Sequence, residues 1–159
     1  MARFTTDIFA QFNKKWALLS AGTKEKHNTM TISWGGMGTL WGKPVVTVYV
    51  KPCRYTYGFM NDNEYFTVSF FPEEYRRDLS ILGSKSGRDG DKVALTRLTP
   101  VAAKHGVDFA QAELSFVCKK IYAQPFALDQ VPREVAEGLY TRIPPHTMFI
   151  GEVVDVIER

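Results

Sequence analysis

Hydroxyl side chains and glycines follow one another between Asn28 and Gly36, which reads Asn-Thr-Met-Thr-Ile-Ser-Trp-Gly-Gly. Hydroxyls and exposed backbone amides can hydrogen-bond the carbonyl groups and ring nitrogens of a flat heterocycle. Glycine also lets the backbone approach such a ring closely. The segment therefore predicts contacts to a heterocycle, although a strand with solvent-facing threonines would have the same sequence.

Two further segments combine cations with small or hydroxyl side chains, which suits the binding of an anion. Lys51 to Tyr57 stands where a strand is expected to pass into a helix. The first turn of a helix leaves N–H groups unpaired and so favours a phosphate, and we expect Thr56 to cap this helix. Ser84 to Lys92 places three cations among serines and glycines, the composition of an anion-binding loop. The alternatives are a capped surface helix and a flexible polar loop.

No local motif for catalysis by side chains accompanies these segments. The sequence contains no GxSxG, Walker A or GxGxxG motif, and its three histidines lie far apart without metal-ligand spacing. Cys53 and Cys118 form no CxxC pair, and Cys118 fits a buried strand position. No metal site is predicted. If the protein is an enzyme, a cofactor supplies the chemistry, and a ring-binding segment with two phosphate-binding loops indicates a nucleotide-like ligand such as FMN.

Length and composition limit the classes to which the protein can belong. The chain has 159 residues, 45% of them hydrophobic, and a net charge of +3, so we expect one domain spanning residues 1–159. The charge excess is too small to indicate nucleic acid by itself. No secretory signal precedes Asp7, and the apolar run 45–50 is too short for a membrane span. We therefore expect a cytoplasmic protein without membrane contact.

The positions of the aromatic residues divide them into two groups. Phe66, Phe70 and Phe116 lie on strand patterns and are predicted to be core, whereas Trp34, Tyr55 and Tyr57 fall inside the ligand-binding segments.

The adjacent Glu73 and Glu74 precede cations on an expected helix and are predicted to be solvated.

Strands dominate the periodicity of the sequence. Alternation and β-branched runs predict strands, and 3.6-residue spacing predicts short helices. The strands are expected at 16–20, 28–34, 45–50, 64–71, 107–109, 113–123 and 149–157, and the helices at 54–61, 73–82 (ended by Gly83), 91–98 and 132–140. The glycines between residues 35 and 42 are expected to loosen the chain. Because helices do not alternate regularly with strands, a small antiparallel barrel with helices at its rim fits better than a doubly wound sheet.

Taken in order, several segments resemble the flavin reductase-like family of FMN-binding split barrels, and its flavoredoxin branch in particular. The resembling segments are 28–36, 43–44, 55–57, 86–89 with 91–92, and 146–153. The resemblance implies a mainly β (α+β) fold, a six-stranded antiparallel split β-barrel with short peripheral helices. It also implies a homodimer with FMN near the subunit interface.

The resemblance further implies a set of cofactor-binding residues. Those for the isoalloxazine ring are Asn28, Thr29, Met30, Thr31, Ser33 and Trp34, and those for the phosphate and ribityl chain are Lys51, Arg54, Tyr55 and Thr56. Ser86, Gly87 and Lys92 would complete the polar end, and His146 would approach the ring edge. Arg54 departs from the closest family pattern, where an uncharged residue is expected, so its role is inferred from its charge and position.

These expectations describe an FMN-dependent oxidoreductase in which the flavin carries the chemistry. NADH, NADPH or a partner protein would be the electron donor, so the protein would be either a flavin reductase or an electron carrier. No motif identifies a pyridine-nucleotide site. The alternative is a non-redox ligand- or nucleic-acid-binding barrel, since the cations and aromatics of Arg54 to Tyr57 would also suit base stacking.

Overall fold

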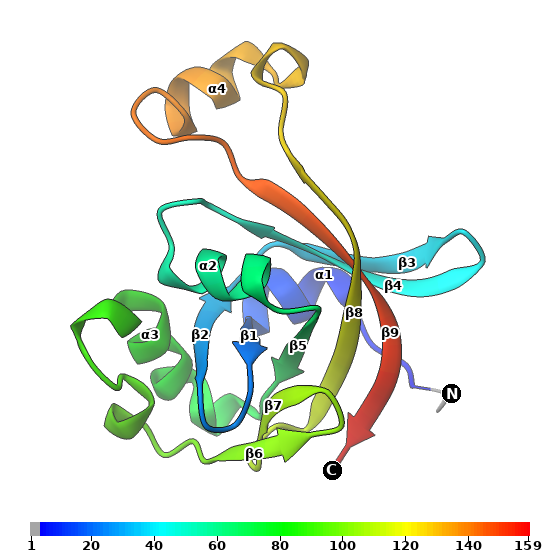
Figure 1. Cartoon of the computed structure of the whole chain (residues 1–159), viewed down its shortest axis with the longest axis vertical. Helices are drawn as coiled ribbons and strands as arrows, with labels where there is room; N and C mark the ends of the chain where they lie inside the picture. The colour runs from blue at the N-terminus through cyan, green and yellow to red at the C-terminus, as the bar shows by residue number, and fades with distance from the viewer. Residues whose placement is uncertain (1–3) are drawn as a thin grey trace.

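The fold is built from antiparallel strands that form one large sheet and one small hairpin (Figure 1). The computed structural model describes residues 4–159. Seven strands form the large sheet in the order β2-β1-β5-β8-β9-β4-β3, and β6 pairs with β7. Their bounds are β1 Ala17–Gly22, β2 His27–Ile32, β3 Gly35–Leu40, β4 Lys43–Val50, β5 Tyr65–Phe70, β6 Pro100–Ala103, β7 Gly106–Phe109, β8 Leu114–Pro125 and β9 Thr147–Glu158. The predicted fold class is confirmed, but the main sheet has seven strands rather than six.

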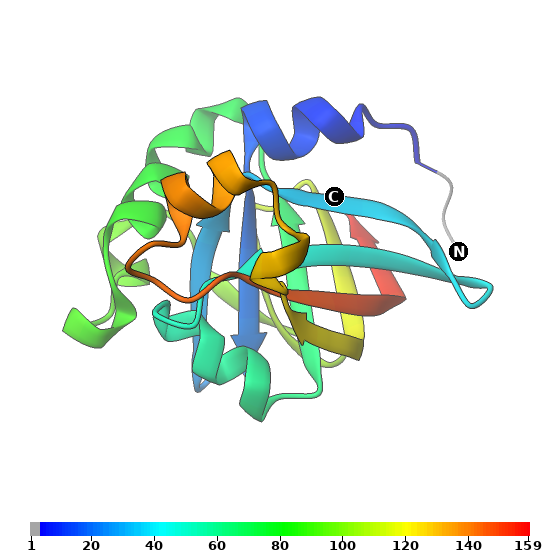
Figure 2. The same ribbon diagram turned by 90° about the horizontal axis from the view of Figure 1, so that it is seen from above.

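Short helices surround the curved sheet, as Figure 2 shows from above. They are α1 Ile8–Ala10, α2 Tyr55–Asp62, α3 Arg76–Ser84 and α4 Arg133–Leu139. A π-helical turn, Gln11–Lys15, continues α1, and single 3-10 turns occupy Glu73–Tyr75, Gly87–Asp89, Val93–Leu95 and Leu128–Gln130. Because the helices lie outside the curved sheet, its interior is filled by side chains.

Two clusters of buried apolar side chains hold the fold together. Inside the curved sheet the largest are Phe66, Phe70, Phe116 and Phe149, so the prediction that the first three are core is confirmed. Gly151 lets β9 pass close to this cluster, since a Cβ there would lie 2.5 Å from Cζ of Phe66. The second cluster packs α3 against the sheet and includes Leu18, Phe71, Leu79, Leu82 and Phe109.

A long loop, here called the arm (residues 126–145), leaves the sheet after β8 and returns at β9. β8 and β9 pair antiparallel, with register shifts between Val117 and Cys118 and between Lys120 and Tyr122. Such irregularities bend a strand pair and increase its twist. Figure 1 shows the arm, with α4, standing away from the sheet.

Several local predictions were wrong, and for β3 the reason is strand pairing that outweighs the sequence pattern. The glycine-rich segment forms β3, which pairs with β4 from Gly35↔Val48 to Leu40↔Lys43. The hairpin turns through Trp41 and Gly42, with φ of 53° and 71°. The predicted helix at 91–98 is only the turn Val93–Leu95, and β6 and α1 had no clear signal. Gly83 does not end α3, since the helix continues to Ser84.

No helix within residues 4–159 is long and apolar enough to cross a membrane.

Candidate functional site

Two adjoining hollows lie along β2, next to the start of α2 and the loop that follows α3. The first, here called the aromatic hollow, has a volume of about 190 Å³ and includes Trp34, Tyr49 and His146 in its lining. The second, the cationic hollow, has a volume of about 220 Å³ and runs between α2 and the loop 84–92. Met30, Thr31 and Arg54 border both, so the two hollows form one continuous surface.

The structure brings nearly all of the predicted cofactor-binding residues to these hollows. Those bordering the aromatic hollow are Met30, Thr31, Ser33, Trp34, Lys51, Arg54 and His146. Those bordering the cationic hollow include Asn28, Tyr55, Thr56, Ser86, Gly87 and Lys92. Thr29 borders neither, because its hydroxyl accepts a hydrogen bond from the Ser20 hydroxyl at 2.9 Å within the sheet. Tyr57 also lies outside, packed against Phe149 of the core.

One hydrogen bond connects β2 to α2 at the cationic hollow. The Asn28 amide donates from Nδ2 to Oγ1 of Thr56 over 2.8 Å, and both residues are buried. Thr56 therefore does not cap the helix as predicted. The N-cap position belongs to Arg54, whose side chain makes no capping bond. The Thr56 hydroxyl is used to fix β2 against the first turn of α2.

Gly87 brings the loop after α3 against this junction. A Cβ at Gly87 would lie 2.1 Å from Oδ1 of Asn28 and 2.8 Å from Cδ1 of Tyr55. Real Cβ atoms do not approach other heavy atoms so closely, so a larger residue would push the loop outward. The hollow thus keeps its shape because position 87 has no side chain.

Lys92 is a buried cation at the same hollow, with 6% of its surface exposed. Its ammonium donates to the carbonyl oxygens of Leu82, at 2.8 Å, and Lys85, at 3.1 Å. It therefore holds the C-terminal end of α3, where carbonyl groups lack helical partners. An ammonium has three donors, so one remains for an anion. Burial, and then the positive charge of Arg54, lower the pKa of Lys92 to about 8.

Arg88 contributes a further cation that was not among the predicted site residues. Its Nη1 donates to the carbonyl oxygen of Cys53 at 3.0 Å, and its guanidinium carbon lies 5.3 Å from the ring centroid of Tyr55. The side chain joins the loop after α3 to the start of α2. The sequence placed Arg88 in a cationic loop but carried no signal for which way its side chain turns.

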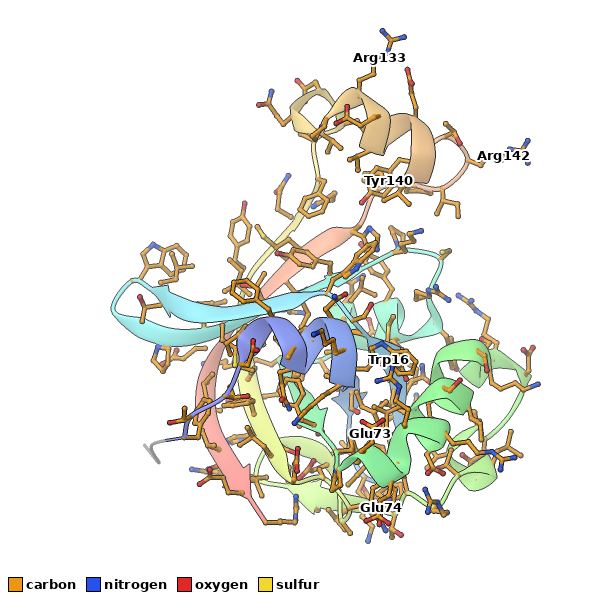
Figure 3. The ribbon with its side chains drawn as sticks, turned by 180° about the vertical axis from the view of Figure 1, so that it is seen from behind. Trp16, Glu73, Glu74, Arg133, Tyr140 and Arg142 are labelled. Atoms are coloured by element: carbon orange, nitrogen blue, oxygen red, sulfur yellow. The ribbon has the colours of Figure 1, made fainter. Side chains whose placement is uncertain are left out.

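His146 stands at the other end of the site, with 7% of its surface exposed. Its ring centroid is 5.4 Å from that of Trp34, and its Nδ1 is 2.7 Å from the hydroxyl oxygen of Tyr140. Burial first, and then the positive charges of Lys51 and Arg54, lower the pKa of His146 to about 4. The ring is therefore neutral at pH 7. Figure 3 shows Tyr140 in the arm.

Tyr49 and Tyr140 are site residues that the sequence did not reveal. Tyr49 occupies one position of the apolar strand β4 and was indistinguishable from a core residue. Tyr140 lies at the end of the helix predicted at 132–140 and is the C-cap of α4, but no sequence pattern relates this position to the hollow.

Glu73, Glu74 and Cys118 lie away from the hollows, whereas the exposed Cys53 borders the cationic hollow. Glu73 and Glu74 are exposed, as predicted, and Figure 3 shows them far from Tyr140. Cys118 is buried, as predicted, and burial raises the pKa of its thiol. Within the described part of the chain, no three His, Cys, Asp or Glu side chains gather to hold a metal.

The model of the flavin reductase like domain family matches residues 9–159. No curated protein matches the sequence. Among solved structures, the flavoredoxin from Methanosarcina acetivorans is 20% identical, with a TM-score of 0.72 over 100% of this chain and 75% of that one. The flavoredoxin of Desulfovibrio vulgaris (Miyazaki F) is 24% identical, with a TM-score of 0.70 over 91% and 69%. An FMN-binding protein from Thermus thermophilus with bound p-hydroxybenzaldehyde is 20% identical, with a TM-score of 0.72 over 100% and 81%. These structures share the fold of this chain.

Proposed function

Since this chain belongs to the flavin reductase-like domain family, we propose that it is an FMN-binding oxidoreductase, either a flavin reductase or a flavoredoxin-type electron carrier. The observation that carries the proposal is the polarity of the two hollows. Aromatic side chains, a neutral imidazole and Lys51 gather at one end, and the cations Arg54, Arg88 and Lys92 gather at the other. FMN has the same polarity, with a flat ring at one end and a phosphate at the other.

The cationic hollow suits a phosphate by the chemistry of its donors. Lys92 has one ammonium donor left, and Arg54 and Arg88 border the same hollow. Charge-assisted hydrogen bonds from such groups are the strong ones. The missing side chain at Gly87 lets the loop pack closely against Asn28 of β2 and Tyr55 of α2, which gives the hollow its shape.

The aromatic hollow suits the flavin ring. Trp34 and Tyr49 offer flat apolar surfaces, while Ser33 and Lys51 supply hydrogen-bond donors at its border. Together the two hollows fall within the size range of ligand sites, about 300–1,000 Å³.

Bound FMN would supply hydride and electron acceptance, which no amino-acid side chain provides. The chain's own residues would bind and orient the cofactor. Lys51 and Arg54 would add positive charge beside the ring end, which favours an anionic over a neutral ligand there. We assign no catalytic role to a side chain.

The proposal includes a homodimer in which a second copy covers the surface next to the aromatic hollow. An apolar depression lined by Phe9, Phe12, Trp34 and Met37 adjoins that hollow and shares Trp34 and Tyr49 with it. Phe9 is 87% exposed. Monomeric proteins rarely leave large apolar patches in water.

Binding and reduction are tested in sequence with the purified protein. We expect added FMN to bind with a shifted flavin absorption spectrum, and a protein that does not bind FMN contradicts the proposal. Anaerobic NADH or NADPH then separates the two roles. Rapid bleaching of the flavin identifies a reductase, and a flavin that stays oxidised until a partner protein reduces it identifies a carrier.

A further inference from the structure

The arm is fastened to the sheet at His146, the residue that borders the aromatic hollow. Tyr140 is the C-cap of α4, and its N–H donates to the carbonyl oxygen of Ala136. Its hydroxyl meets Nδ1 of His146 at 2.7 Å, and the backbone N–H of Phe126 donates to the His146 carbonyl at 3.0 Å. Among the described residues, the Tyr140–His146 pair is the one side-chain hydrogen bond that joins the arm to its base.

The direction of this hydrogen bond follows from the charge of the imidazole. Lys51 and Arg54 are the charged side chains bordering the hollow, and the other neighbours of His146 are the aromatic rings of Trp34 and Tyr140. These surroundings hold His146 in its neutral form. A neutral imidazole has one acceptor and one donor nitrogen. A phenol is the better donor of the two partners, which favours donation from the Tyr140 hydroxyl to Nδ1 and a ring proton on Nε2.

We propose that Tyr140 is a positioning residue that holds His146 as an Nε2–H donor toward an acceptor oxygen of the ligand in the aromatic hollow. The inference rests on the proposed function, because it takes that ligand to be a flavin with ring carbonyl groups. Nδ1 is occupied from the arm, so Nε2 is the nitrogen free to face a ligand. The imidazole then needs no reorientation or tautomer exchange when the ligand binds.

The same bond links the arm to the hollow. A ligand oxygen that accepts from Nε2 favours the tautomer in which Nδ1 accepts from Tyr140. The coupling is reciprocal: the Tyr140–His146 contact strengthens ligand binding, and bound ligand strengthens the Tyr140–His146 contact by the same free energy.

Imidazole ¹⁵N NMR of the ligand-free full-length protein at pH 7 tests the tautomer. We expect the spectrum of His146 to show an unprotonated Nδ1 and a protonated Nε2. Tyr140→Phe should mix the two tautomers and raise the pKa of His146, because donation from the hydroxyl to an unprotonated Nδ1 favours the neutral ring. Tyr122→Phe makes the same chemical change at an exposed residue of β8, and should change neither. A protonated Nδ1 in the unmodified protein, or an unchanged spectrum in Tyr140→Phe, overturns the inference.

Titration with FMN, followed by fluorescence, tests the consequence for binding. We expect Tyr140→Phe to weaken FMN about three- to tenfold, the effect of losing one hydrogen bond. His146→Gln keeps an amide donor near the position of Nε2 and should retain more affinity than His146→Asn. Equal losses in both His146 variants, or full affinity in Tyr140→Phe, would contradict the donor role. The NMR result needs no ligand, so it decides the tautomer even if FMN fails to bind and the proposed function falls.

Discussion

At the scale of single residues, the most informative side chain is Lys92, because it is buried and incompletely used. Its ammonium satisfies two carbonyl groups at the end of α3 and keeps one donor free. Such a group can serve the fold and the ligand at once. Lys120 allows the structural role of Lys92 to be separated from its role in ligand binding. It also donates to two carbonyl oxygens, those of Met60 and Asn61, but it lies outside both hollows.

We expect Lys92→Met to weaken FMN at least about tenfold, since a charge-assisted hydrogen bond contributes about 1.5–3 kcal/mol. Riboflavin, which lacks the phosphate, should lose little affinity. Lys120→Met removes a similar carbonyl contact and should leave both affinities unchanged. Isothermal titration with both ligands measures the difference, and equal losses of FMN and riboflavin would show that Lys92 acts only on the fold.

His146 makes the stability of the protein depend on pH. Its pKa is about 4 in the folded protein and about 6.5 in an unfolded chain, so the unfolded state binds more protons between these values. The free energy of unfolding should therefore fall as the pH drops from 6.5 to 4, by about 2–3 kcal/mol from this residue. Urea denaturation across this pH range measures it. In His146→Gln the free energy of unfolding should fall less steeply with decreasing pH. A fall as steep as in the unmodified protein would contradict the lowered pKa of His146.

At the scale of elements, Gly87 determines how closely the loop after α3 approaches β2 and α2. We expect Gly87→Ala to lower FMN affinity at least about fivefold, because the new Cβ forces the loop away from Asn28 and Tyr55 at a cost of about 1–3 kcal/mol. Gly58→Ala is the matched control. Its Cβ would meet nothing within 4 Å, and it should raise stability by about 0.5–1 kcal/mol by improving α2. Full FMN binding in Gly87→Ala would show that the close approach is unimportant.

The elements also show which parts of the site could be predicted from the sequence. Asn28, Arg54 and Lys92, which the family resemblance implied as cofactor-binding residues, all border the cationic hollow. Alternation along β2 puts Thr31 on the same strand face as Thr29, yet Thr31 borders both hollows and Thr29 borders neither. The difference lies in the hydrogen bond that fixes the Thr29 hydroxyl within the sheet. The hydrogen-bond partner of Thr29, Ser20, lies on the neighbouring strand β1, and a pattern within β2 alone does not predict that contact. β3 was missed because its glycines have low β-propensity and pairing with β4 decides its conformation.

At the scale of the whole molecule, the proposed homodimer places the apolar depression beside the aromatic hollow at its interface. If a second copy covers it, Phe9→Asp should turn a dimer into a monomer, because an unpaired carboxylate is costly to bury. Leu95→Asp places the same charge at another exposed apolar residue, 60% exposed, and should leave the dimer intact. Sedimentation velocity measures the mass. A dimer that survives Phe9→Asp would place the interface elsewhere.

The pairing of β4 with β9 has a consequence for how the protein is made. Val45 pairs with Glu152 and Val50 with Thr147. One edge of β4 therefore stays unpaired until β9, about 100 residues later in the sequence, is in place. Such distant pairings slow folding, and on the ribosome the unpaired edge is open to other chains until β9 emerges. His146 immediately precedes β9, whereas Lys51 follows β4. The aromatic hollow is therefore complete only when β9 has paired with β4. A ligand that needs the whole hollow stabilises the folded protein but does not assist the early steps of folding.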